Sequence, residues 1–275
     1  VLFADDTTLH NSDSNINNLF QRMNNNLKQL EEWCTFNQID VNRVKTKYML
    51  FSRKTIPVNN EFSLLYSNNP IERVTTFKFL GIVLDESLNW HHHTNQVKLK
   101  ISQGLYILNS LKNITTSEVR KSIYYSLIHS HLTYGCILWG NAQKKSIKPL
   151  QMSQKKAVRK IDNAAYNAHA DPLFAKFNIL KIEKLHMLQS LQFMHKLHLS
   201  ILPQALTNLL SRFEAPHNTH TRFAHIFRPP QTHLKVAHSS ILFHGPRNYR
   251  SIPPHMSEIL NFKIFTKRCK RHITS

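Results

Sequence analysis

Val-Leu-Phe-Ala-Asp-Asp-Thr-Thr-Leu, residues 1–9, is the stretch on which the interpretation of the whole chain depends. Its apolar start and its β-branched threonines favour two short strands, and the acidic residues between them favour a tight turn. Asp5 and Asp6 would then project from a hairpin, and carboxylate oxygens are the ligands that hard divalent cations prefer. The stretch therefore predicts a candidate metal site, although an acidic pair in a turn is also ordinary turn chemistry.

Residues 10–85 favour one helix and several further strands. Ser14 or Asn15 can cap a helix whose apolar residues recur at three- and four-residue steps as far as Trp33. Residues 48–51, 62–66 and 74–84 are typical of strands, and Asn/Pro turns separate them. We therefore expect an α+β layer with one helix on one face of the strands.

After Asp85 the pattern becomes helical. Apolar stripes at helical spacing predict helices over 97–111, 119–132, 147–161 and 182–201, the last of them ended by Pro203, and a basic helix over 259–273. Residues 211–255 hold 6 of the 11 prolines and 7 of the 18 histidines and have little periodicity. They predict loops and short elements.

Composition excludes several classes of protein. The 275 residues are 41 % hydrophobic, too apolar for a disordered basic tail, and no apolar run is long enough to span a membrane. Three widely spaced cysteines imply neither a disulfide framework nor a metal motif, so we expect an intracellular protein, with nucleus or cytoplasm left open. No glycine-rich phosphate loop occurs.

Positive charge is concentrated in the C-terminal part of the chain. The formal net charge is +20, and residues 151–275 hold 19 Lys+Arg against 5 Asp+Glu. So large an excess is typical of a protein that binds nucleic acid. A basic protein without such a partner and a protein that binds a membrane surface are the alternatives.

Four motifs in the first 90 residues follow one another in a familiar order: Phe3-Ala4-Asp5-Asp6, Asn42 with Lys45-Thr46-Lys47, Phe79-Leu80-Gly81, and Leu88-Asn89-Trp90. Others follow downstream: Tyr134-Gly135 with Trp139-Gly140, Leu150-Gln151 with Ala157-Val158-Arg159, and Gly245-Pro246-Arg247 with Ile252-Pro253. In these motifs the chain resembles the C-terminal half of a reverse transcriptase from a non-long-terminal-repeat (non-LTR) retrotransposon of the jockey-like kind.

The resemblance implies three regions. Residues 1–88 would be the C-terminal part of a polymerase palm, an antiparallel sheet plus a helix. Residues 89–165 would be a helical thumb, and residues 166–275 a basic helical C-terminal region. The partners that it implies are an RNA template, a DNA primer and, for the full-length parent, deoxynucleoside triphosphates, with no membrane.

The resemblance also implies roles for individual residues. Asp5 would ligate catalytic Mg²⁺, for which Mn²⁺ is the alternative, and Asp6 would support it. Lys45 would lie near the phosphates of the incoming nucleotide and protonate the leaving pyrophosphate; otherwise it is a solvated loop lysine. The hairpin Phe79, Leu80 and Gly81 would grip the primer end, or Gly81 is an ordinary bulge glycine. The thumb would contact phosphates through Lys98, Lys100, Lys112 and Arg120.

Two further expectations concern activity. Because two adjacent aspartates cannot enclose two metal ions, and because the chain starts with Val1 in an apparent strand, we expect a fragment that does not polymerise alone. The competing hypothesis is a non-catalytic, nucleic-acid-binding remnant of a degenerate element.

The three consecutive histidines 91–93 cannot all face one site, so we expect no metal there.

Overall fold

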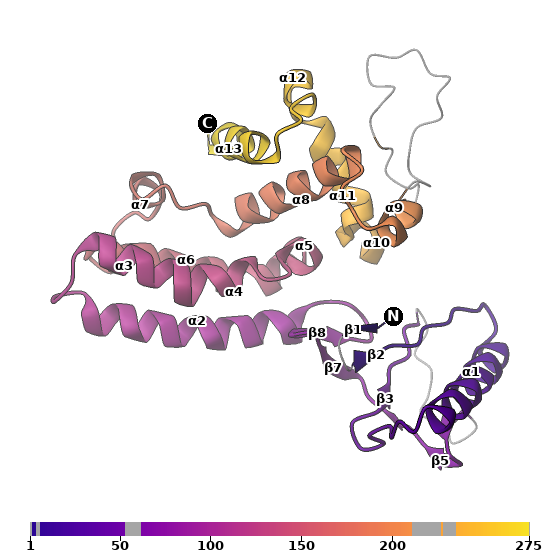
Figure 1. The fold of residues 1–275 in the computed structure, drawn as a ribbon. Coiled ribbons are helices and arrows are strands. Elements are labelled where there is room, and N and C mark those ends of the chain that lie inside the picture. The colour runs from indigo at the N-terminus through magenta and orange to yellow at the C-terminus, as the bar shows by residue number, and fades with distance from the viewer. Residues whose placement is uncertain (1, 4–5, 53–61, 211–226, 228–234, 275) are drawn as a thin grey trace. The chain divides into compact units, whose positions relative to one another are not determined.

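The chain divides into two compact units, Val1–Ser87 and Leu88–Ser275. The computed structural model, drawn in Figure 1, describes residues 2–3, 6–52, 62–210, 227 and 235–274. The end of the first unit lies one residue from the end expected for the palm region. Residues 89–165 and 166–275, expected as separate regions, lie together in the second unit.

The first unit is built around helix α1 (Ile16–Phe36). The Asn15 side chain accepts a hydrogen bond from the backbone N–H of Asn17 at 2.8 Å, so Asn15 is the N-cap and the alternative, Ser14, is not. Phe20 and Leu27 bury one stripe of the helix against Leu64 and Tyr66. The unit is thus a mixed helix-and-strand layer, in agreement with the expected α+β class.

The strands of the first unit form separate pairs. Three pairs are antiparallel: β1 (Leu2–Phe3) with β2 (Asp6–Thr7), β4 (Leu65–Tyr66) with β5 (Asn69–Pro70), and β7 (Thr76–Phe79) with β8 (Ile82–Asp85). The fourth, β3 (Lys47–Tyr48) with β6 (Glu72–Arg73), is parallel.

The expected antiparallel pairing is confirmed in three of these pairs, but within the described residues every sheet has two strands and one pair is parallel. The strand expected over 48–51 is wrong beyond Tyr48, where the ladder ends. Tyr48 and Leu50 instead pack against the apolar stripe of α1. A short apolar run such as 48–51 can be buried against a helix or within a sheet, and the residue types alone do not distinguish these two outcomes.

The second unit is helical in the described residues. Its elements are α2 (His91–Leu111), α3 (Ser117–Tyr124), the π-helix η1 (Tyr125–His129), α4 (Ser130–Thr133), α5 (Cys136–Trp139), α6 (Lys144–Asp162), α7 (Asp171–Lys176), α8 (Ile182–His198), α9 (Gln204–Leu210), α10 (Lys235–Ser239), α11 (Ile241–Arg250), α12 (Pro254–Ser257) and α13 (Phe262–Thr274). They stack in layers: α2 packs on α6, α6 contacts α8, and α8 packs on α11 and α13 (Figure 1).

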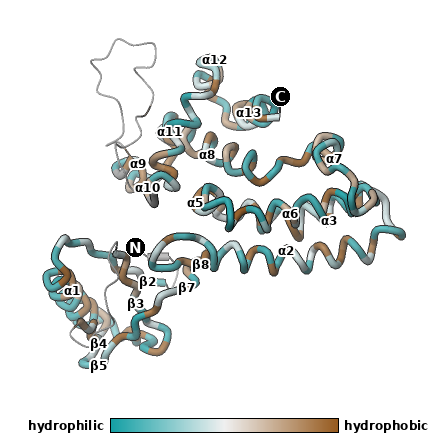
Figure 2. The backbone as a smooth tube through the Cα atoms, turned by 180° about the vertical axis from the view of Figure 1, so that it is seen from behind, coloured by the Kyte–Doolittle hydropathy of each residue, from teal (hydrophilic) through white to brown (hydrophobic). Residues whose placement is uncertain are grey.

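Helix α6 lies at the centre of these layers, and its sequence pattern predicts its packing well. The six residues of its expected stripe are all buried: Ile147, Leu150, Gln154, Ala157, Val158 and Ile161. Figure 2 shows the matching alternation of apolar and polar residues along α2 and α6. The polar member, Gln154, donates to Tyr124 Oη at 2.9 Å and to the Leu180 carbonyl at 2.8 Å, so it ties α6 to its neighbours.

The stripe expected over 119–132 is confirmed at Ile128 and Leu132, but its first part is displaced by one residue. Val119 is 46 % exposed, whereas Arg120, Tyr124, Ile128 and Leu132 are buried. The four buried residues are spaced by four, which drifts around an α-helix. The wider turn of η1 begins directly after Tyr124 and contains Ile128, and it compensates for that drift.

A second core joins α8, α11 and α13. The His195 ring stacks on Phe265 at 3.6 Å between centroids, and its Nδ1 lies 3.0 Å from Tyr249 Oη. Helix α8 ends at His198, before the expected Pro203, and α11, of ten residues, lies in the segment expected to hold loops and short elements. Cys34, Cys136 and Cys269 are all buried and unbridged.

No helix in the described ranges combines the length and the apolar character that crossing a membrane requires.

Candidate functional site

The first candidate feature is the hairpin that carries the acidic pair. Strands β1 and β2 pair with Phe3 opposite Asp6, so residues 4 and 5 connect them. Asp6 lies in the return strand and is exposed. Asp5 lies outside the described residues. The pairing on either side of residues 4–5 is what a carboxylate pair carried on a two-stranded hairpin requires.

The second feature is an ordered turn that exposes Lys45. Asn42 organises it: the side-chain Oδ1 accepts from the Lys45 backbone N–H at 3.1 Å, and the Asn42 carbonyl accepts from Thr46 Oγ1 at 2.9 Å. The nearby Lys47 forms an ion pair with Glu72. Within the described residues no ion pair holds Lys45, so its ammonium group faces solvent on a fixed backbone.

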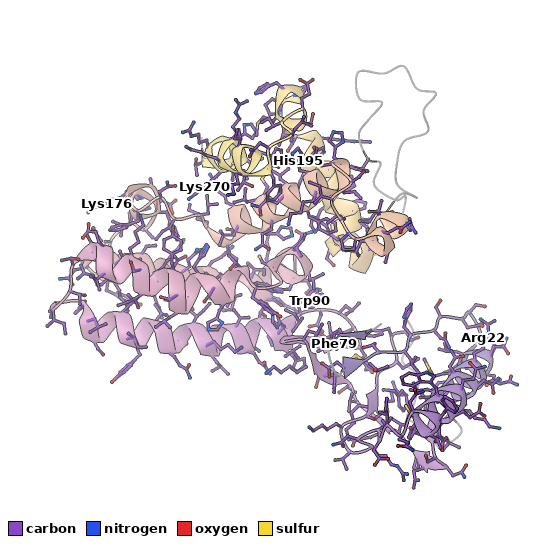
Figure 3. All side chains as sticks on the ribbon, in the orientation of Figure 1. Arg22, Phe79, Trp90, Lys176, His195 and Lys270 are labelled. Carbon is purple, nitrogen blue, oxygen red and sulfur yellow. The ribbon has the colours of Figure 1, made fainter. Side chains whose placement is uncertain are left out.

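The third feature is the β7–β8 hairpin. Leu80 and Gly81 are the two central residues of its turn, with φ of 45° and 82°. Positive φ at both positions is typical of a type I′ turn, whose twist matches that of paired strands. Gly81 is thus a turn glycine and not a bulge glycine. Phe79, labelled in Figure 3, is the last residue before the turn and is half-buried.

Lysines on and beside α2 form the fourth feature, in the second unit. Lys98 and Lys100 are exposed on the helix, and Lys112 is half-buried just after its end. The Lys160 ammonium donates to Asn109 Oδ1 at 2.5 Å. Partial burial lowers the pKa of Lys160, and the charges of Lys112 and Lys156 lower it further. The end of α2 and the C-terminal part of α6 therefore present one electropositive patch.

Arg120 differs from these lysines. Its side chain is buried: Nε donates to the Ile161 carbonyl at 2.9 Å, and one terminal nitrogen donates to the Lys112 carbonyl at 2.7 Å and to the Thr115 carbonyl. A guanidinium held by three carbonyls is a structural clamp, and we remove Arg120 from the expected phosphate contacts. Sequence reasoning missed this role because arginine is rarely fully buried.

The histidine run does not form a metal cluster. His91 and His92 are exposed, whereas His93 is buried, with its ring 5.4 Å from that of Trp139 and 6.5 Å from that of Trp90. Burial, with a smaller effect of Lys100, lowers the pKa of His93 to about 4. No group of three or more metal-binding side chains occurs among the described residues.

Sequence comparison identifies relatives of the chain. It is 27 % identical over 187 residues to the probable RNA-directed DNA polymerase from transposon BS of Drosophila melanogaster, covering 66 % of this chain and 20 % of that protein. It is 26 % identical over 139 residues to the probable RNA-directed DNA polymerase from transposon X-element of the same species, covering 48 % of this chain and 15 % of that protein.

A third relative is the RNA-directed DNA polymerase from mobile element jockey of Drosophila melanogaster, 22 % identical over 168 residues, 60 % of this chain and 18 % of that protein. The chain thus spans about a fifth of the length of these relatives. No family model matches the chain, and no solved structure matches it either. In these alignments the chain is similar to reverse transcriptases of non-LTR retrotransposons.

Proposed function

We propose that the chain is part of an RNA-directed DNA polymerase of a non-LTR retrotransposon. Its sequence similarity to three such polymerases carries the proposal. The hairpin with Asp6, the exposed Lys45 and the β7–β8 turn supply side chains of the types that nucleotidyl transfer uses. The substrates would be an RNA template, a DNA primer and deoxynucleoside triphosphates.

In this proposal the acidic hairpin holds Mg²⁺. Carboxylate oxygens suit Mg²⁺, and Asp6 is exposed to solvent on a paired strand. Asp5 would be the ligand and Asp6 its support. The ion would neutralise charge on phosphate oxygens as the phosphodiester bond forms.

Lys45 would supply the proton for the leaving pyrophosphate. Its ammonium group is a mobile point cation on a backbone that Asn42 fixes, which suits contact with phosphates. The turn at Phe79, Leu80 and Gly81 would lie at the primer end, where the absence of a side chain at Gly81 allows close approach of a sugar. Lys98, Lys100 and Lys112 would contact the phosphates of the duplex.

The metal site is tested directly by Mn²⁺ binding, followed by electron paramagnetic resonance. We expect the chain to bind Mn²⁺, and the double variant Asp5→Asn/Asp6→Asn to bind it at least tenfold more weakly. Asp40→Asn removes an exposed carboxylate of the same unit and is the matched control. Equal weakening in both variants would contradict the proposed site.

Activity is tested by primer extension on a primed RNA with Mg²⁺. Because two neighbouring aspartates cannot enclose both ions of a two-metal site, we propose that the 275-residue chain does not extend the primer by itself. Extension that Asp5→Ala abolishes would contradict this.

The second candidate function is a non-catalytic nucleic-acid-binding remnant. The excess of 19 Lys+Arg over 5 Asp+Glu in residues 151–275 favours it, since that excess is independent of the acidic hairpin. This candidate predicts duplex binding without Mn²⁺ binding, whereas the polymerase proposal predicts both.

A further inference from the structure

Helix α13 carries a basic face that the proposed polymerase site does not use. Its sequence contains no acidic residue, and it includes Lys263, Lys267, Arg268, Lys270 and Arg271. Three of them, Lys263, Lys267 and Arg271, are spaced by four residues and are exposed. At about 1.5 Å rise per residue they form a row of cations about 6 Å apart. This row is called the α13 track below.

The opposite face of the helix holds the α13 track rigidly in place. Phe265 and Cys269 are fully buried in the core shared with α8, and Phe265 stacks on His195. Lys184 of α8 donates to the Ile273 carbonyl at 2.5 Å, which ties down the last turn. The Asn261 side chain accepts from the Lys263 backbone N–H at 3.0 Å and fixes the first turn. In Figure 3 the labelled His195 and Lys270 mark the α8 and α13 sides of this packing.

The charge of the α13 track is not neutralised within the described residues. No ion pair there involves Lys263, Lys267 or Arg271. Two acids elsewhere in the unit already have basic partners: Asp162 pairs with Lys176, and Asp171 pairs with Lys181 at 3.0 Å. Glu258, in the segment before α13, is exposed and forms no ion pair with the α13 track. An exposed, ordered and uncompensated row of cations matches a polymer of regularly spaced anions.

We infer that the α13 track binds a nucleic-acid strand through its phosphates, as a surface separate from the acidic hairpin and from the lysines of α2. The spacing of about 6 Å, from the helical rise, is close to the separation of successive phosphates along one strand. Ile264, 48 % exposed beside the track, offers an apolar contact for a base or sugar. The inference does not depend on the chain being a polymerase.

The test uses the full chain and fluorescence anisotropy of labelled 20-nucleotide single strands, as RNA and as DNA. The variant is Lys263→Gln/Lys267→Gln/Arg271→Gln. The matched control, Lys144→Gln/Lys145→Gln/Lys148→Gln, removes the same charge from exposed positions of α6 in the same unit. Circular dichroism checks that both variants keep their helix content. A further control, the Arg variant Lys263→Arg/Lys267→Arg, changes the side chains of the track but keeps their charge.

We expect the track variant to bind at least tenfold more weakly at low salt, with the slope of log K against log[salt] reduced by about 2, as the loss of three single-strand phosphate contacts requires. The control and the Arg variant should change the affinity less than threefold. If the affinity for one of the two strands, RNA or DNA, falls more than that for the other, the α13 track binds that strand preferentially.

Equal losses of affinity in the track variant and the control overturn the inference. Unchanged nucleic-acid binding with lost binding to phosphatidylserine vesicles also overturns it, in favour of a membrane surface.

Discussion

The guanidinium group of Arg120 forms hydrogen bonds with three segments of the chain. It donates to the carbonyls of Lys112, Thr115 and Ile161, at the end of α2, in the following loop and at the end of α6. Carbonyls at helix ends have no partner within their own helix, so a buried donor that supplies several of them stabilises the corner where the helices meet.

Replacing Arg120 by Met tests this role. The variant keeps an unbranched apolar stem but removes the guanidinium group, which leaves three carbonyls without donors. We expect the free energy of unfolding of the second unit to fall by about 3 kcal/mol. Urea unfolding measures it, with Lys121→Met, the half-exposed neighbour, as the control that should change by about 0.5 kcal/mol or less. Equal effects of the two variants would show that Arg120 is not a clamp.

Gly81 is the residue whose backbone conformation the turn dictates. At φ of 82° a side chain clashes with the backbone, so Gly81→Ala should weaken the β7–β8 hairpin by about 1–2 kcal/mol. Leu80→Asn should strengthen it, because asparagine tolerates the positive φ that leucine adopts here. Amide hydrogen exchange of Lys78 and Val83 measures both, and changes of the same sign would exclude the turn assignment.

At the scale of the elements, helix α2 packs closely against η1 at Gly104. A Cβ added there would lie 2.7 Å from Ile128 Cγ1 and 3.2 Å from the Leu127 carbonyl oxygen. Gly104→Ala would gain about 1 kcal/mol of helix propensity, but overpacking costs about 1–3 kcal/mol.

We therefore expect Gly104→Ala to lower the stability of the second unit, measured as the midpoint of thermal unfolding. Ser102→Ala, on the exposed side of the same helix, is the control and should not lower it. A higher midpoint for Gly104→Ala would mean that α2 and η1 separate without penalty.

Element prediction succeeded where periodicity is local and regular. The stripe of α6 and the N-cap of α1 follow from residues a few positions apart, and the structure confirms both. The displaced stripe around Tyr124 depends on a π-turn, and the parallel pairing of β3 with β6 depends on which distant segments meet. Neither leaves a periodic signal in the sequence.

The candidate site was predictable to a similar degree. The hairpin pairing around residues 4–5 and the turn at Leu80 and Gly81 agree with the hairpins that their motifs predict. The electropositive patch of Lys112, Lys156 and Lys160 was only partly predicted, because its members lie on different helices. The burial of Arg120 was missed because residue type alone indicates exposure.

At the scale of the whole molecule, buried histidines make the second unit sensitive to acid. The rings of His186 and His244 are 4.5 Å apart, T-shaped and buried between α8 and α11. Burial lowers the pKa of His186 to about 4, and burial with the charge of His186 lowers the pKa of His244 to about 3. Below pH 6.5 the unfolded chain therefore binds more protons than the folded one, and stability falls with pH.

We expect each of these two histidines to remove about 2 kcal/mol of stability between pH 7 and pH 5, with the loss ending near the folded pKa. Urea midpoints at the two pH values measure it. His186→Met/His244→Phe should reduce the dependence by about 4 kcal/mol. It should leave the part that is due to His93, whose pKa burial also lowers to about 4. The exposed His255→Gln should leave the dependence unchanged. A double variant with the full pH dependence of the original chain would assign the acid sensitivity to other groups.

The three native cysteines make the protein convenient for site-specific labelling. Only a thiolate reacts readily with maleimides, and Cys136 and Cys269 are fully buried, with burial raising the pKa of each to about 12. Cys34 is also buried. A fluorophore could thus be attached to a new cysteine at the exposed Ser102 without first removing the native thiols, so single-molecule measurements can use an otherwise unmodified sequence.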